Sequence, residues 1–170
     1  MYSTAYLFRV AKTISVSSIG LMFLLIVLNN TTDYYSNYHF VEHVLKMDTT
    51  FPDSTVHYRS ITSPVLFHAG YILIIAAELI TAILCLGGGW RMFRNLKKDA
   101  SSFHAAKALA VGGLAVGIII FFLGFEVIGG EWFEMWQSST MNGLNAAERI
   151  VSFLVLILIL LHFKDEAIAE

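Results

Sequence analysis

Residues 65–86 read VLFHAGYILIIAAELITAILCL, a run whose single charged side chain is Glu78. A helix of about 20 apolar residues crosses a hydrocarbon layer about 30 Å thick, and it satisfies its own backbone hydrogen bonds there. Three further stretches are comparably apolar, namely residues 14–28, 108–125 and 150–163. The sequence therefore predicts an all-α, polytopic membrane protein with four transmembrane helices in a bundle.

The composition supports this fold class. Of the 170 residues, 56% are hydrophobic and 14% are charged, and the mean hydropathy is +0.67. A soluble domain of this size could not bury so much apolar surface in one core. We expect a single domain over residues 1–170, with spans at about 10–29, 65–89, 107–127 and 145–163, outer loops at 30–64 and 128–144, and a cytoplasmic loop at 90–106.

The basic residues between the spans predict the orientation. Eight of them fall on one side: Arg9, Lys12, Arg91, Arg94, Lys97, Lys98, Lys107 and Lys164. Three fall on the other side: Lys46, Arg59 and Arg149. Because Lys and Arg accumulate in cytoplasmic loops, both termini are predicted to be cytoplasmic. Residues 29–31 lack a small-residue cleavage pattern, so we expect the first helix to stay uncleaved.

Two outer segments are predicted to form interfacial helices. In the first, Phe40, Val41, Val44 and Leu45 share one helical face, and Pro52 favours a turn after the helix. In the second, Trp132 and Trp136 are four residues apart behind a glycine pair. We expect the two segments to pack together as an outer cap and to present an interaction surface comprising Phe40, His43, Val44, Asp48, Phe51, Glu131, Trp132 and Trp136.

Glu78 is the candidate for a buried polar or proton-conducting role. An acid at the centre of a span costs roughly 2.5 to 3.5 kcal/mol to insert, so Glu78 should face protein or water and stay neutral or find donors. Ser15, Ser17 and Ser18 of the first span and Thr81 one turn away offer hydroxyl groups. The favoured interpretation is a structural clamp between two spans. Proton or cation passage, and contact with a partner subunit or lipid, are the alternatives.

Two further patterns concern helix contacts. Glu126 and Arg149 lie near the outer ends of the third and fourth spans, so we expect an intramembrane ion pair, with an anion or substrate site at Arg149 as the alternative. Gly113 and Gly117 stand at the GxxxG interval, which predicts close helix packing within the bundle or between subunits.

A metal site is weakly indicated in the first outer segment. His39 and His43 are four residues apart on one helical face, with Glu42 beside them. The pattern lacks a His-Glu-x-x-His order, and a solvated polar face is the favoured interpretation. Glu131 and Glu134 could act as paired carboxylates, but their spacing favours a solvated edge. We therefore expect no metal ion.

Three motifs resemble a known family. FVEHVLKMDTTFP at residues 40–52, GEWFEMWQS at 130–138 and NG at 142–143 are similar to the bacterial predicted small integral membrane proteins grouped as domain of unknown function 2165. The resemblance implies four spans, a bacterial inner membrane and an acid in the second span, which Glu78 matches. Met141 stands where the family pattern has Trp. The resemblance implies no established activity.

These observations favour a non-catalytic function. The net charge of −2 gives no reason to expect a nucleic-acid partner, Cys85 has no second cysteine to pair with, and no cofactor is expected. The leading hypothesis is an accessory, stabilising or assembly subunit of a larger membrane protein complex, surrounded by the lipid bilayer. A small homo-oligomeric ion channel or proton-coupled transporter using Glu78 is the alternative, and a metal-dependent or lipid-modifying enzyme on the outer face comes third.

Overall fold

Helices make up all the regular structure in residues 3–168, the part of the chain that the computed structural model describes. Four helical stretches are long and apolar enough to span a membrane. They are α1 (Thr4–Thr32), α3 (Pro64–Arg94), the run formed by α4 (Ala100–Ala106), α5 (Ala108–Ile118) and η2 (Ile119–Trp132), and α6 (Leu144–His162). The predicted all-α class and the number of spans are confirmed.

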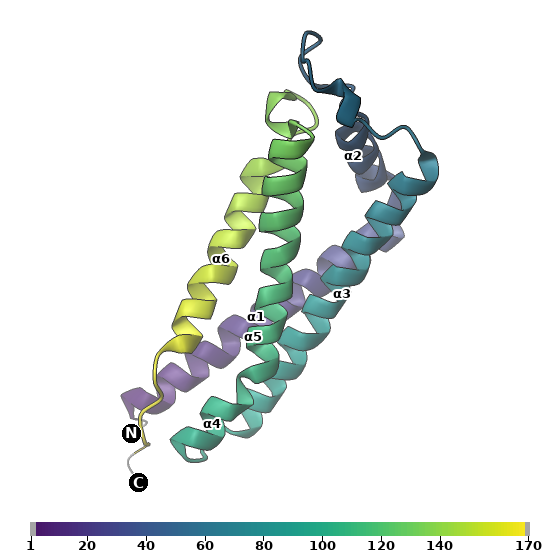
Figure 1. The fold of residues 1–170 in the computed structure, drawn as a ribbon. Helices are drawn as coiled ribbons and strands as arrows, with labels where there is room; N and C mark the ends of the chain where they lie inside the picture. The colour runs from purple at the N-terminus through teal and green to yellow at the C-terminus, as the bar shows by residue number, and fades with distance from the viewer. Residues whose placement is uncertain (1–2, 169–170) are drawn as a thin grey trace.

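The four spans form two arms that separate toward one end (Figure 1). In one arm α1 and α3 lie antiparallel, and in the other η2 packs against α6. The arms meet where α5 contacts α3, close to the end at which α1 begins and α6 ends. We call that end the terminal side and the opposite end, which carries α2 (Tyr34–Lys46), the cap side.

Glycines allow the arms to meet closely. A Cβ atom added at Gly113 would lie 2.7 Å from Sγ of Cys85, and one at Gly88 would lie 2.5 Å from the backbone nitrogen of Ala110. A Cβ at Gly117 would lie 3.0 Å from Leu154 Cδ1. These distances leave no room for a side chain at the contact between α5 and its neighbours, which is the packing that small residues permit in membrane helices.

The third span changes its helical type near its middle. Residues Ile119–Trp132 are π-helical, a conformation that is rare and often occurs at functional sites. This stretch extends the span to Trp132, beyond the predicted end at residue 127. Gly129 and Gly130 are buried within this π-helical stretch. The span therefore continues through the glycine pair, whereas the prediction placed the pair in the second outer segment.

The cap side contains α2, η1 (His57–Arg59) and η3 (Met135–Gln137). Helix α2 ends where Met47 adopts a left-handed conformation, with φ of 56°. The second outer segment holds the three-residue η3 helix instead of one helix through both tryptophans, because Glu134 is also left-handed, with φ of 51°. Trp132 therefore belongs to the span and Trp136 to the connection.

Candidate functional site

Glu78 is buried in α3 and is held by the cap-side end of α1. Its Oε2 atom accepts a hydrogen bond of 2.8 Å from Nδ2 of Asn30, and Oδ1 of Asn30 accepts one of 2.7 Å from Asn37. The hydroxyl group of Tyr71 donates to the backbone oxygen of Asn30. These contacts form a polar relay from the buried carboxyl group to the exposed side chain of Asn37.

The predicted partners of Glu78 are wrong. Ser17 lies opposite Gly89, well toward the terminal side, because α1 and α3 run antiparallel. Ser17 and Thr81 donate to backbone oxygens of their own helices, at Thr13 and Ala77. The register of the two helices brings Asn30 to the level of Glu78, and the sequence alone does not define that register.

Glu78 also borders a cavity of about 250 Å³, here called the Glu78 chamber. Its walls are mostly apolar and come from α1, α2, α3, η2 and α6. Asn37 and Ala146 are its exposed lining residues, so the chamber opens at the cap side between α2 and α6. Among the residues that the structure describes, none hydrogen-bonds to Oε1 of Glu78.

Aromatic rings attach α2 to α3. Tyr38 stacks on His68 with 4.3 Å between ring centroids, and Tyr34 donates to or accepts from Nδ1 of His68 at 2.8 Å. The ring centroid of Tyr34 also lies 4.8 Å from that of Tyr71. These contacts place the apolar face of α2 between the two arms of the bundle.

The two outer segments contact each other through Phe51 and Trp136, two residues of the predicted surface. The ring of Phe51 meets that of Trp136 edge-on at 5.9 Å, and the backbone N–H of Phe51 donates to Oε1 of Gln137. Arg59 lies 4.7 Å from the ring centroid of Trp132. We define Phe51, Tyr58, Trp132 and Trp136 as the aromatic patch.

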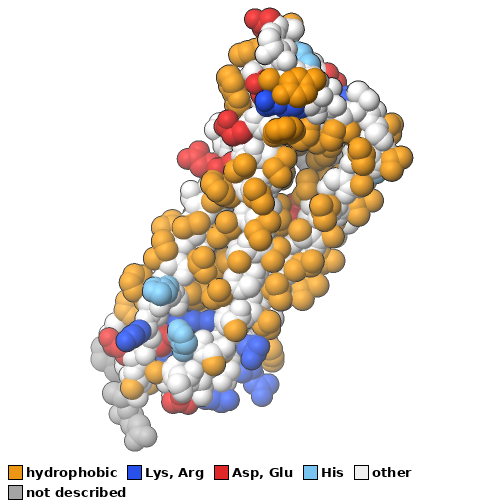
Figure 2. Space-filling view, viewed as in Figure 1, with side chains coloured by type: hydrophobic (Ala, Val, Ile, Leu, Met, Phe, Trp, Pro, Cys, Tyr) orange, Lys and Arg blue, Asp and Glu red, His pale blue; other side chains and the backbone are white. Residues whose placement is uncertain are grey.

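The apolar face of α2 packs elsewhere, which corrects the prediction that the two tryptophans bury it. Phe40 stacks on Phe125 of η2 with 6.2 Å between centroids. Val44 and Leu45 border a second cavity of about 370 Å³ between α3 and η2, here called the lateral groove. Figure 2 shows this hollow between the two arms, with hydrophobic side chains along both walls. His43 faces Asp48 instead, with 2.8 Å between Nδ1 and Oδ1.

Glu126 and Arg149 do not meet in the structure. Neither residue forms an ion pair within 4.0 Å in the described part of the chain, and Arg149 is exposed. The Oε1 atom of Glu126 is buried without a hydrogen-bond partner among those residues. The π-helical turn changes the direction in which η2 side chains point, which a count of ordinary helical turns cannot predict.

The polar face of α2 pairs its groups locally. Oε2 of Glu42 lies 3.1 Å from Nδ1 of His39, and its other oxygen binds Lys46. Hydrogen bonds from Lys46 and His39 lower the pKa of Glu42. Residues 3–168 contain no group of three or more His, Cys, Asp or Glu side chains arranged to hold a metal ion.

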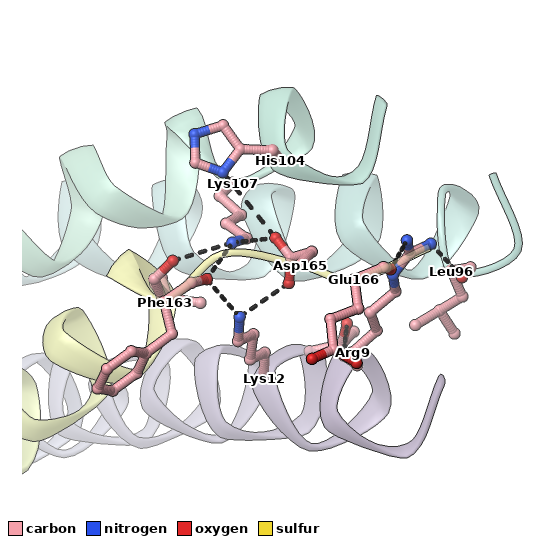
Figure 3. Close-up of polar contacts among 10 residues, drawn as sticks. Arg9, Lys12, Leu96, His104, Lys107, Phe163, Asp165 and Glu166 are labelled. Carbon is pink, nitrogen blue, oxygen red and sulfur yellow. Dashed lines mark hydrogen bonds and ion pairs between the residues drawn. The ribbon is translucent and has the colours of Figure 1, made fainter. Parts of the chain in front are cut away.

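A cluster of buried charges joins the spans on the terminal side (Figure 3). Nζ of Lys12 lies 2.8 Å from Oδ1 of Asp165, and Nζ of Lys107 pairs with Oδ2 of the same carboxylate. The side chains of all three residues are at most 4% exposed. Arg9 completes the cluster, donating to backbone oxygens of Leu96, Lys98 and Glu166.

We call Arg9, Lys12, Lys107 and Asp165 the terminal-side clamp. It ties α1, the start of α5 and the segment after α6 to one point. Burial disfavours the charged form of the Asp165 carboxylate, but hydrogen bonds and charge from Lys107 and Lys12 outweigh it and lower its pKa. The carboxylate therefore remains ionised, as its pairing with two buried lysines requires.

Sequence reasoning missed the clamp. Arg9, Lys12 and Lys107 contributed only to the charge count that predicted the orientation, although Lys107 directly precedes an apolar run. No sequence pattern indicated a buried role for Asp165, which follows the last span. The contact depends on the chain beyond α6 folding back between α1 and α5.

The comparisons with known proteins agree with this architecture. The family model described as "Predicted small integral membrane protein (DUF2165)" matches residues 8–164. The chain belongs to this family. The DUF2165 match covers the first span from residue 8 onward, the other three spans, both outer segments and three of the four clamp residues. Neither the curated proteins nor the solved structures contain a match to the sequence.

Proposed function

We propose that this DUF2165 protein is a non-catalytic accessory, stabilising or assembly subunit that presents its cap side to a larger membrane protein. In this proposal it resides in a bacterial inner membrane with both termini in the cytoplasm, as the distribution of basic residues favours. Figure 2 shows several Lys and Arg side chains gathered at the terminal-side end of the visible face.

The observation that carries the proposal is the exposure of the aromatic patch. Tyr58 is 78% exposed, and Phe51, Trp132 and Trp136 are each about half exposed. The patch residues are fixed by contacts with one another and with Arg59, so they present a defined surface. Aromatic residues and Arg are enriched in protein interfaces, and rigid aromatic side chains supply large contact area at low entropic cost.

Photo-crosslinking from the patch tests this proposal. A benzophenone amino acid replaces Tyr58 in the full chain, and irradiated cells are analysed for protein adducts. We expect one defined adduct with a larger membrane protein, which Trp136→Ala reduces at least several-fold. The matched control places the benzophenone at Phe93, which is exposed on the terminal side. Lipid adducts alone, or an adduct at Tyr58 that Trp136→Ala leaves unchanged, would contradict the proposal.

A second candidate, a small ion channel or proton-coupled transporter using Glu78, is favoured by one observation. The relay from Glu78 through Asn30 to exposed Asn37 borders a chamber that opens at the cap side. Purified protein in liposomes with a pH-sensitive dye tests it. Proton flux in the wild type that Glu78→Gln abolishes would support transport, and absence of flux in the wild type would contradict it.

A further inference from the structure

We propose that the lateral groove binds one phospholipid, with an acyl chain between α3 and η2 and the phosphate group on Arg59. The proposal is independent of the suggested role as a subunit. It rests on the lining and size of the groove and on the charge at its cap-side end.

The groove is built from apolar surface. Its walls come from the apolar face of α2, from residues 70–77 of α3 and from the π-helical part of the third span, and Phe133 and Met135 close its cap-side end. Gly70 and Gly124 leave space in opposite walls. A Cβ atom at either position would meet its nearest neighbour at 3.8 Å, an ordinary contact, so neither glycine is needed for close helix packing.

The size and lining of the groove select a chain-like apolar occupant. Water is disfavoured, because a cavity holds water only where polar groups can bind it. The groove has a volume of about 370 Å³, and its lining is almost entirely apolar, which suits an alkyl chain. Both walls belong to spans, so lipid chains of the surrounding bilayer reach it directly.

Arg59 supplies a cation at the cap-side end of this groove. Its guanidinium group lies over the ring of Trp132, whose backbone oxygen accepts a hydrogen bond of 3.3 Å from Nη1. The next residue, Phe133, borders the groove.

The charge of Arg59 has no carboxylate partner among residues 3–168, and its Nε atom is buried without a hydrogen bond there. The nearby Glu134 carboxylate is occupied by Ser54 and Gln137 instead. Of the other cap-side cations, Lys46 is paired with Glu42. A guanidinium group presents several planar donors that match a phosphate diester, and this one lies where an outer headgroup would lie above its chains.

Lipid binding by the purified protein tests both parts of the site. The probes are palmitoyl-oleoyl-phosphatidylglycerol and a diacylglycerol with the same chains but no phosphate, titrated into delipidated protein and counted by native mass spectrometry. We expect one phosphatidylglycerol per chain at saturation, with affinity at least about tenfold above that of diacylglycerol, the effect of a lost charge-assisted hydrogen bond.

Two pairs of variants separate the chain from the headgroup. Gly124→Phe fills the groove and should abolish binding of both lipids, whereas Gly112→Phe should bind as the wild type does, because a Cβ at Gly112 meets nothing within 4 Å. Arg59→Gln should reduce phosphatidylglycerol affinity to that of diacylglycerol, whereas Arg149→Gln, at an exposed cap-side cation that does not border the groove, should not.

Gly70→Leu fills the opposite wall and replaces Gly124→Phe if that variant does not fold. Binding that both filling variants leave unchanged would overturn the acyl-chain site. Equal affinity of the wild type for the two lipids, or no loss with Arg59→Gln, would overturn the phosphate site. Crosslinking from Tyr58 is measured separately, so failure of the lipid site and failure of the subunit role give different results.

Discussion

At the residue scale, the terminal-side clamp contains the largest concentration of buried charge among residues 3–168. Two lysines, Lys12 and Lys107, share the Asp165 carboxylate, and Arg9 beside them binds backbone oxygens only. Backbone oxygens near the end of α6 complete the coordination of the lysines. Buried charges are stable only while they are paired and hydrogen-bonded. Removal of the Asp165 carboxylate should therefore destabilise the clamp more than any other single side-chain change in it.

Asp165→Ala should lower the free energy of unfolding by about 3 kcal/mol, because removing one member of a buried ion pair leaves the others uncompensated. Thermal unfolding of the detergent-solubilised protein, followed by circular dichroism, measures the effect. Glu166→Gln is the matched control, because the clamp uses the backbone oxygen of Glu166 and its side chain is exposed. Equal melting temperatures for the two variants would contradict this account of the clamp.

The clamp should also make stability depend on pH. The folded pKa of Asp165 is lowered, so its stabilisation is fully present above the unfolded value of about 3.9 and is lost as the pH falls through the folded pKa. We expect little change due to this group between pH 7 and 5, and a decline below about pH 4. Asp165→Asn should flatten that decline relative to the wild type in melting curves recorded from pH 7 to 3.

Glu78 should act as a structural hydrogen-bond partner of Asn30. Glu78→Gln retains an oxygen acceptor and should melt close to the wild type, whereas Glu78→Leu leaves Asn30 without its partner and should cost about 1 kcal/mol. Unfolding in detergent distinguishes the two variants. A folded Glu78→Gln protein that fails in a complementation assay would instead favour the proton-coupled alternative.

The candidate site was predictable from sequence only in part at this scale. Glu78 was predicted because it is the single acid in an apolar run. Its partner Asn30 was not, because the residue of α1 that faces Glu78 depends on the register between α1 and α3. Asp165 was not predicted either, because no local sequence pattern distinguishes it from a solvated residue after a helix.

At the element scale, the contact between α3 and α5 depends on glycines at fixed positions. Gly113 faces Cys85 across that contact, and its neighbour Gly112 faces open space. The two adjacent residues therefore offer a direct test of whether close approach stabilises the bundle.

Gly113→Ala should destabilise the protein by about 1 to 3 kcal/mol, because the added methyl group collides with Cys85 Sγ and with backbone nitrogen. Gly112→Ala should be neutral or stabilising by up to about 1 kcal/mol, because Ala is the better helix former and meets nothing within 4 Å. Melting temperatures of the two variants in one detergent check the difference. A destabilised Gly112→Ala would refute the contact as described.

The number of spans was predicted correctly because apolar runs and membrane thickness together define it. The π-helical part of the third span was not, because its residues are as apolar as those of an ordinary helix and nothing in their order signals a wider turn. The same limit explains why the predicted partners of Glu126 and of the Trp132–Trp136 pair were wrong.

At the scale of the whole molecule, the two arms are joined at the terminal side and separated at the cap side. The clamp and the contact between α3 and α5 hold the first end, whereas aromatic stacking through α2 connects the arms at the second. The sequence predicted a bundle with a cap, but not this asymmetry, which depends on long-range contacts.

Reporter fusions should establish which way the molecule lies. Fusions at Asn95 and after residue 170 should report cytoplasm, and a fusion at Asp53 should report the opposite compartment, because basic residues concentrate on the terminal side. Alkaline phosphatase and green fluorescent protein activities measure the two locations. A phosphatase signal at Asn95 would reverse the orientation, and identical signals at Asn95 and Asp53 would change the number of spans.

The chain order of the clamp has a consequence for biosynthesis. Arg9, Lys12 and Lys107 leave the ribosome before the fourth span, and Asp165 follows it. Until translation passes that aspartate, the nascent protein carries two lysines without their carboxylate partner and an arginine without the backbone oxygen of Glu166. A chain that is interrupted after the third span can insert its helices, but it lacks Asp165 and cannot form the terminal-side clamp. Such a chain would be exposed to membrane proteases that remove incompletely folded products.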